Sequence, residues 1–190
     1  MPRLLVGCLV ALAAAVVVNA TAHAADETSC VITDDTRKLA LTLSWEEFDQ
    51  KSNSPASFRA FALRACYREA AELIEYYLAN KPTLAESQQR NSRFHAGQMY
   101  GHAGDERRAL ELIRSARWPE QPANAALNWN TYVAGVVAFL EKDRAALSAA
   151  REHLESEGGR NLINARVLRR MEKCFDKSYD DVWKAACEVS

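Results

Sequence analysis

The stretch RFHAGQMYGHAGDERRALELIRSA, from Arg93 to Ala116, decides the fold. Its first part carries apolar or small residues three and four positions apart, which places them on one face of a helix. Gly104 can take the positive φ that ends a helix, and Asp105 can accept from the free N–H groups that open the next one. The helical spacing then resumes at Ala109, Leu112, Ile113 and Ala116. The stretch therefore predicts two short amphipathic helices that pack antiparallel across a tight turn.

A second copy of this pattern follows thirty-eight residues downstream, and a fainter copy precedes it by thirty-nine. In the downstream copy, Ala134-Gly135 matches Ala96-Gly97, and Asp143 matches Asp105. In the upstream copy, Ala65-Cys66 stands near the turn. Three hairpins at a nearly constant period predict a stacked helical array, in which each unit buries an apolar face that it could not bury alone.

The turn and the second helix of each unit carry a resemblance to a known family. Gly104-Asp105 followed by Ala109, and Cys66-Tyr67-Arg68-Glu69-Ala70, are similar to tetratricopeptide-type repeats, over roughly residues 55 to 156. The resemblance implies a superhelical, usually non-enzymatic fold, whose first helices line a concave surface that grips extended peptides. The period here is longer than the 34 residues usual in that family.

The expected architecture is all-α, a single domain over residues 25–190 made of stacked antiparallel hairpins with a C-terminal helical cap. The hairpins are expected at about 55–79, 83–116 and 124–156, and the cap at 160–188.

Two helix starts before and within the first hairpin can be predicted from their capping residues. Ser44 and Glu47 form a capping box that predicts a short helix to about Gln50. Ser54 followed by Pro55 predicts the start of the next helix, with Pro55 in the first turn, where its missing N–H costs nothing.

The first 24 residues have the features of a signal peptide. Arg3 precedes an apolar run from Leu4 to Val18, and Ala22-His23-Ala24 offers small residues at the cleavage positions. We therefore expect cleavage near Ala24 and a periplasmic or secreted mature chain. The alternative is a lipoprotein box at Leu5-Val6-Gly7-Cys8, although this box precedes most of the apolar run instead of following it.

Four cysteines remain after that cleavage, an even number that suits an oxidising compartment. They are Cys30, Cys66, Cys174 and Cys187, and three pairings are possible. We favour Cys30 with Cys66 and Cys174 with Cys187. A metal site is disfavoured because no two of these cysteines have the close spacing common in zinc sites, and no metal or other cofactor is expected.

The charge of the mature chain is nearly neutral, with 23 basic and 25 acidic residues after removal of the signal. We expect no nucleic-acid partner, because such a surface requires a basic excess or stripe. The apolar run is too short for a comfortable membrane span of about 20 residues, so no stable membrane insertion is expected.

A polar stripe on the first helix of the second unit is the principal candidate for ligand contact. It consists of Asn91, His95, Gln98 and His102, whose spacing places them on one helix face. Asn128 and Asn130 occupy the corresponding region of the third unit and could bond to a peptide backbone. The alternative interpretation of the stripe is a solvated face. A metal site on the two histidines is disfavoured, since seven helical residues separate them by about 10 Å.

The sequence contains no recognised catalytic motif, so no catalytic residue is assigned. We expect an exported scaffold that binds a protein or peptide. One alternative is a small periplasmic hydrolase that acts on cell-wall glycan with a helix-borne Glu. Another is a partner of one folded protein, which would use the basic face formed by Arg166, Arg169, Arg170 and Lys173.

Overall fold

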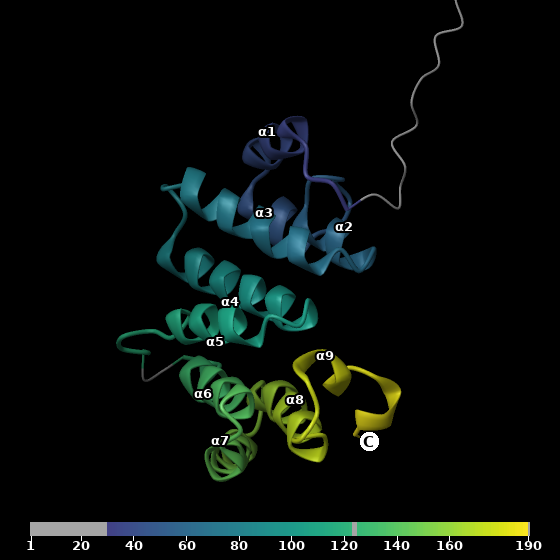
Figure 1. Cartoon of the computed structure of the whole chain (residues 1–190). Helices are drawn as coiled ribbons and strands as arrows, with labels where there is room; N and C mark the ends of the chain where they lie inside the picture. Colours follow the sequence, from purple (N-terminus) through teal and green to yellow (C-terminus); the bar gives the residue numbers. More distant parts are fainter. Residues whose placement is uncertain (1–29, 123–124, 190) are drawn as a thin grey trace, which may run out of the picture.

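The computed structural model describes residues 30–122 and 125–189 (Figure 1). Within these ranges every regular element is a helix, which confirms the all-α prediction. The expected signal peptide with its cleavage site near Ala24, the lipoprotein-like box and Asn124 lie outside the described residues. None of the helices in the described ranges is both long enough and apolar enough to cross a membrane.

The first layer of the fold surrounds the helix α3 (Tyr67–Asn80). The short helix α2 (Phe58–Leu63) pairs with it, and α1 (Asp34–Thr42), for which no structure was predicted, packs on it (Figure 1). Between α1 and α2 lies a five-residue π-helix, η1 (Glu46–Gln50), preceded by the predicted capping box. The ring of Phe48 stacks on Tyr77 with centroids 3.9 Å apart, which fixes η1 against α3.

The start of α2 differs from the prediction. Ser57, and not Ser54, is its N-cap and accepts from the N–H of Arg59 at 3.2 Å. Pro55 lies in a turn before the helix. The buried Ser57 hydroxyl also donates to the carbonyl of Phe48 at 2.9 Å, so this cap additionally ties α2 to η1.

The remaining helices follow one another as side-by-side pairs. The middle pair is α4 (Glu86–His102) and α5 (Glu106–Ser115), and the next is α6 (Trp129–Leu140) and α7 (Arg144–Glu157). The predicted starts of α4 and α6 were too early. Asn128 is the N-cap of α6, because its side chain accepts from the N–H of Thr131 at 3.2 Å.

The turns inside the three pairs share one backbone conformation. Each contains a residue with positive φ, namely 59° at Ala65, 80° at Gly104 and 59° at Lys142. The following residue donates its N–H to the carbonyl five positions earlier, from Cys66 to Phe61, from Asp105 to Tyr100 and from Asp143 to Ala138, at 2.8 to 3.0 Å. This is the Schellman arrangement that ends helices. The thirty-eight- and thirty-nine-residue sequence periods therefore correspond to a repeated backbone structure.

Glycines at equivalent positions of α4 and α6 allow close helix packing. A Cβ on Gly97 would lie 2.6 Å from Cγ1 of Ile113 and 3.0 Å from the carbonyl of Ala109, both on α5. A Cβ on Gly135 would lie 2.4 Å from a side-chain carbon of Leu168. The Ala-Gly pairs noted in the sequence thus mark points where one helix presses on another.

The C-terminal part returns toward the middle of the molecule. After α8 (Asn161–Lys173), which packs on α6 and α7, the short α9 (Tyr179–Val182) contacts α4, and a 3₁₀ turn, η2 (Ala185–Cys187), follows (Figure 1). Two disulfides tie the ends to the array, Cys30–Cys66 beside α3 and Cys174–Cys187 between α8 and η2. These are the two cysteine pairings that the sequence analysis favoured.

Candidate ligand-binding groove

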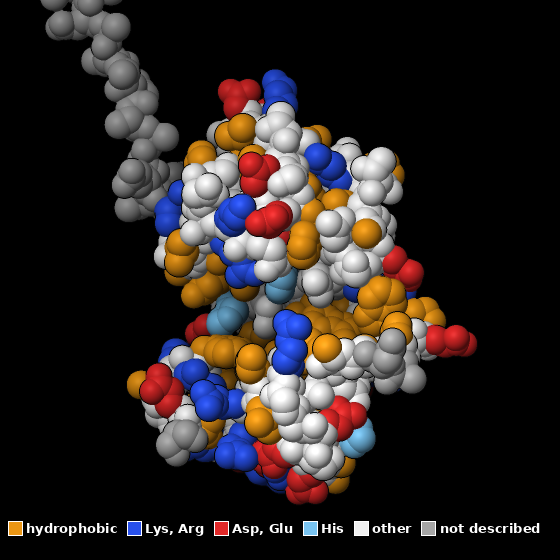
Figure 2. Space-filling view, turned by 180° about the vertical axis from the view of Figure 1, so that it is seen from behind, with side chains coloured by type: hydrophobic (Ala, Val, Ile, Leu, Met, Phe, Trp, Pro, Cys, Tyr) orange, Lys and Arg blue, Asp and Glu red, His pale blue; other side chains and the backbone are white. Residues whose placement is uncertain are grey.

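The polar face of α4 lies between an N-terminal wall and a C-terminal wall. Asn91, His95, Gln98 and His102 are all partly exposed on it, as their spacing predicts. His95 contacts η1 and α2, and His102 contacts α9. Figure 2 shows that this side of the molecule is hollowed at mid-height, where histidine and hydrophobic side chains gather. We call the α4 face between α2 and α9 the α4 groove.

At the N-terminal wall, His95 is paired with a fully buried carboxylate. Its Nδ1 atom lies 2.8 Å from Oδ1 of Asp49, which has no exposed side-chain surface. The Ser92 hydroxyl donates to Oδ2 of Asp49 at 2.8 Å, and Nε1 of Trp45 donates to the Ser92 oxygen at 3.0 Å. Gln50 also donates to this carboxylate. The buried charge is thus surrounded by polar groups, as burial of a carboxylate requires.

The contact with Asp49 determines which ring nitrogen of His95 remains without a partner. The Nδ1 atom faces the Asp49 carboxylate, so Nε2 is the ring nitrogen on the other side of the imidazole. No polar partner of Nε2 exists among the described residues. Because 20% of the side chain is exposed, a ligand can reach this ring.

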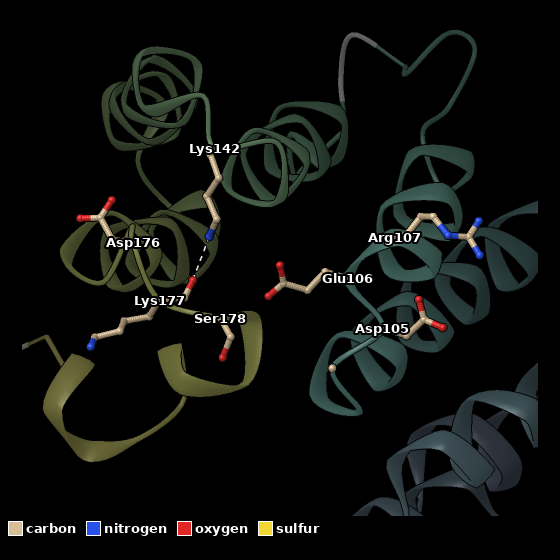
Figure 3. A pocket seen from close by; sticks show the side chains of 8 residues that line it. Asp105, Glu106, Arg107, Lys142, Asp176, Lys177 and Ser178 are labelled. Carbon is tan, nitrogen blue, oxygen red and sulfur yellow. Dashed lines mark hydrogen bonds between the residues drawn. The ribbon is translucent and has the colours of Figure 1, made fainter.

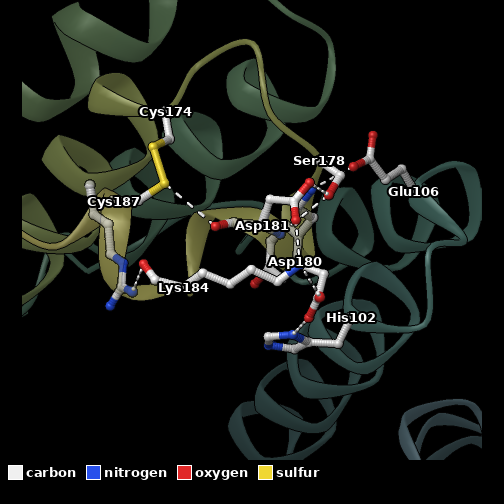
Figure 4. A network of polar contacts seen from close by, with 10 residues as sticks. His102, Glu106, Cys174, Ser178, Asp180, Asp181, Lys184 and Cys187 are labelled. Atoms are coloured by element: carbon white, nitrogen blue, oxygen red, sulfur yellow. Dashed lines mark hydrogen bonds and ion pairs between the residues drawn. A yellow bond between two sulfur atoms is a disulfide. The ribbon is translucent and has the colours of Figure 1, made fainter.

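At the C-terminal wall, His102 lies in a box of aromatic rings. Its Nδ1 atom is hydrogen-bonded to Oδ1 of Asp180 on α9 at 2.9 Å (Figure 4). Its ring stacks on Tyr67 with centroids 4.8 Å apart and meets the edge of Tyr179 at 5.4 Å. The ring of Trp183 is 5.9 Å away. These contacts hold the imidazole in one orientation and repeat the His–Asp pairing seen at His95.

Buried polar groups continue along the same wall. Burial raises the pKa of the Tyr179 hydroxyl far above its ordinary value, while the neighbouring side chains of Gln98 and Trp183 act in the opposite direction. The Nε1 atom of Trp183 is buried and has no hydrogen-bond partner in the described part of the chain. An unpaired buried donor is rare in proteins and costs about 1–3 kcal/mol.

The position of α9 depends on a glycine. A Cβ on Gly101 would lie 2.6 Å from Cδ1 of Tyr179, so only glycine allows this approach. The backbone N–H of Tyr179 donates to Glu106 at 2.6 Å. Ser178 caps α9, accepting from the N–H of Asp181 at 3.2 Å (Figure 4). Hydrogen bonds from Lys184 and Ser178 lower the pKa of the Asp181 carboxyl.

The other predicted ligand residues have different surroundings. The Asn91 side chain has no polar partner among the described residues, so its amide is available. Asn128 donates to Glu157 at 3.0 Å in addition to capping α6. Asn130 accepts from the backbone of Trp118 at 2.8 Å and donates to it at 2.9 Å. Asn128 and Asn130 therefore lie at the start of α6, where the Asn130 side chain bonds to the loop before the helix, apart from the α4 groove.

An open crevice near the turn at Gly104 has a more ordinary explanation. It is lined by charged side chains of both signs, and Figure 3 shows them spread around the opening. Lys142 donates to the carbonyls of Phe175 and Lys177 at 3.1 and 2.8 Å, and Asp105 caps α5. Because these groups hold the turns in place, we assign the crevice no ligand.

The described residues contain one cluster with metal-ligating side chains, formed by Cys30, Cys66 and Glu69. Both cysteines are joined in a disulfide, so neither supplies the thiolate that a metal requires.

The sequence could not reveal the partners of the two histidines. Asp49 and Asp180 stand far from His95 and His102 along the chain, and only the fold brings each pair together. For Asp180 the sequence indicated only that it falls within the expected C-terminal cap at 160–188.

No family model matches the chain, and neither a curated protein nor a solved structure does. We therefore infer the function from the geometry of the α4 groove.

Proposed function

We propose that the chain is a non-catalytic helical scaffold of the periplasm or the extracellular space that binds a protein or peptide in the α4 groove. In this proposal the three helix pairs are tetratricopeptide-like units, and α8 with α9 is the cap. The shared Schellman turns and the equivalent glycines Gly97 and Gly135 support that assignment. The two disulfides suit an oxidising compartment.

One observation carries the proposal. His95, Gln98 and His102 lie on one face of α4 between aromatic walls, and each histidine is held by a carboxylate that leaves its Nε2 atom without a partner. Oriented polar groups on a rigid helix between apolar walls are typical of sites that bind a peptide backbone. Asn91 extends the same face toward the start of α4.

The experiment is a selection from a random peptide library with the oxidised mature chain, followed by affinity measurement on the enriched peptides. Asn91→Ala and Gln98→Ala remove amide groups without touching the His–Asp pairs, so both variants should fold. We expect each to weaken binding about tenfold, the effect of one or two lost hydrogen bonds.

Glu152→Ala is the matched control, because this side chain is 67% exposed on α7. It should bind the enriched peptides as the wild type does. Peptides that bind the Asn91→Ala and Gln98→Ala variants as tightly as the wild type would show that the α4 groove is not the site.

A further inference from the structure

Each end of the α4 groove presents an arginine stacked on an aromatic ring next to a histidine. At the N-terminal end, the ring of Phe58 lies 5.6 Å from that of His95, and the guanidinium carbon of Arg59 lies 4.9 Å from the Phe58 centroid. The Nε atom of Arg59 donates to the backbone carbonyl of Asp49. Its two terminal nitrogens have no partner among the described residues.

The C-terminal end repeats this arrangement with different residues. The ring of Trp183 lies 5.9 Å from that of His102, and the guanidinium carbon of Arg170 lies 5.3 Å from the Trp183 centroid. Arg170 donates from Nε to the carbonyl of Val182 at 2.6 Å and from Nη2 to that of Lys184 at 3.0 Å. These bonds fix the plane of the guanidinium, and Nη1 is left without a partner in the described chain.

A cleft of about 260 Å³ adjoins this second arginine. Arg166, Val167, Arg170, Trp183, Glu188 and Val189 line it. Arg166 is exposed and has no ion pair or hydrogen bond within the described residues. Trp183 lines this cleft and also lies beside His102, so one side chain borders both the cleft and the C-terminal wall of the α4 groove.

The charges of this region are not balanced within the chain. None of Arg59, Arg166 and Arg170 has a carboxylate within ion-pair distance among the described residues. Glu188 lines the cleft beside Arg166 and Arg170 without an ion pair among the described residues, so one carboxylate faces these two arginines. The two acidic groups next to the histidines are engaged. Asp49 is buried against His95, and Asp180 meets His102 and Lys184. Figure 2 shows basic side chains on both borders of the hollow.

We propose that the α4 groove binds an extended acidic segment of a partner protein, with one carboxylate on Arg59 and a second on Arg170 and Arg166. This inference rests on the proposed function and specifies its partner. Guanidinium groups held flat by a ring and by backbone carbonyls present their remaining N–H donors in the geometry that suits carboxylates. The segment lies over Gln98, whose amide can bond to its backbone.

The groove also sets the spacing of the two acidic residues. Seven helical residues from His95 to His102 span about 10 Å, and an extended chain covers about 3.3 Å per residue. Since the arginines lie at the outer sides of the histidines, the two carboxylates should stand about four residues apart.

The test uses fluorescence anisotropy with the oxidised mature chain and three labelled peptides of about ten residues. The first has two glutamates four positions apart among small polar residues, the second has glutamine at both positions, and the third has lysine. We expect the glutamate peptide to bind at least about tenfold more tightly than the glutamine peptide, since two charge-assisted hydrogen-bonding pairs are lost, and the lysine peptide not to bind.

Arginine-to-glutamine variants then test which arginines bind the carboxylates of the peptide. Arg166→Gln changes an exposed side chain without a partner, so it should fold normally and weaken only the glutamate peptide. Arg59→Gln and Arg170→Gln should do the same more strongly, with folding checked by circular dichroism. Arg107→Gln, at a side chain 80% exposed on α5, is the matched control and should have no effect.

Three results would overturn the inference: equal affinity for the glutamate and glutamine peptides, unchanged binding in both Arg166→Gln and a folded Arg59→Gln variant, or preference for anionic phosphatidylglycerol vesicles over the glutamate peptide. If the glutamine peptide binds equally well and depends on Gln98, peptide binding stands and only its acidic specificity fails. If library peptides bind without dependence on Asn91 or Gln98, the proposed function itself fails.

Discussion

Asp49 Oδ1 lies 2.8 Å from Nδ1 of His95, and the carboxylate is fully buried while the imidazole is one-fifth exposed. The carboxylate also accepts from Ser92 and Gln50, so its removal would leave several donors without a partner. We expect Asp49→Ala to lower the free energy of unfolding by about 3 kcal/mol, measured by urea denaturation.

The isosteric variant separates shape from charge. Asp49→Asn keeps an acceptor oxygen and should cost less than Asp49→Ala. Asp35→Ala is the control, because Asp35 is 94% exposed and its ion pair with Lys38 should contribute under about 0.5 kcal/mol. Equal effects of Asp49→Ala and Asp35→Ala would show that the buried carboxylate does not organise this wall.

The turn at Ala65 should become more stable when glycine replaces alanine. Ala65 has a φ of 59°, which costs an L-residue roughly 1 kcal/mol, and its side chain is exposed. We expect Ala65→Gly to raise the free energy of unfolding by about 0.5–1 kcal/mol, and Gly104→Ala, at a φ of 80°, to lower it by about 1 kcal/mol.

The same exchange in a helix gives the control. Ala149 is exposed within α7, where Ala149→Gly should lower the free energy of unfolding by about 1 kcal/mol. A destabilised Ala65→Gly variant would mean that the positive φ at this turn does not carry the strain inferred here.

These turns also show how far local sequence predicts the fold. Gly104-Asp105 has the chemistry that its turn requires, so the hairpin around it could be predicted. Lys142 has no preference for positive φ, and only the repeat period indicated that a turn lies there. The start of α2 was misplaced because Ser54-Pro55 is a valid local signal. Ser57 is the cap because its hydroxyl also bonds to the distant carbonyl of Phe48, a tertiary contact.

Of the candidate site, only the residues on α4 could be predicted from the sequence. The spacing of His95, Gln98 and His102 requires a shared face of α4. What lies opposite that face depends on packing across the chain, since Asp49 and Asp180 come from segments on either side of the array. Sequence spacing therefore located one side of the groove and gave no information about its walls.

Loss of the two disulfides should destabilise the chain unequally. Cys30–Cys66 closes a loop with a sequence separation of 36 residues, and Cys174–Cys187 one of 13. The loop-entropy relation predicts losses of about 4 and about 3 kcal/mol for the corresponding double serine variants. Urea denaturation of the two variants checks the order. A larger loss for Cys174→Ser/Cys187→Ser would mean that contacts of α9, and not loop closure, dominate.

Alkaline pH should destabilise the chain through Tyr77. Burial raises the pKa of Tyr77 to about 12, with the negative charges of Asp49 and Glu47 adding to the effect. The ordinary value is about 10, so between pH 10 and 12 the folded chain holds this proton more tightly than the unfolded chain does. The contribution is fully present below pH 10 and is lost as the pH rises toward 12, at up to about 1.4 kcal/mol per pH unit.

Tyr77→Phe isolates this contribution. At pH 8 the variant should be about 1 kcal/mol less stable than the wild type, because the Tyr77 hydroxyl donates to the carbonyl of Leu43 at 3.0 Å. Above pH 10 the unfolded wild type loses the Tyr77 proton while the folded wild type still keeps it, and the variant has no such group. The difference in free energy of unfolding between the wild type and the variant should therefore shrink and then change sign. Tyr100, whose pKa burial and the carboxylate of Glu75 also raise, titrates in both proteins and does not enter the difference. Urea denaturation of both proteins from pH 8 to 11 measures that difference, and parallel curves would rule out Tyr77 as the source of the alkaline loss.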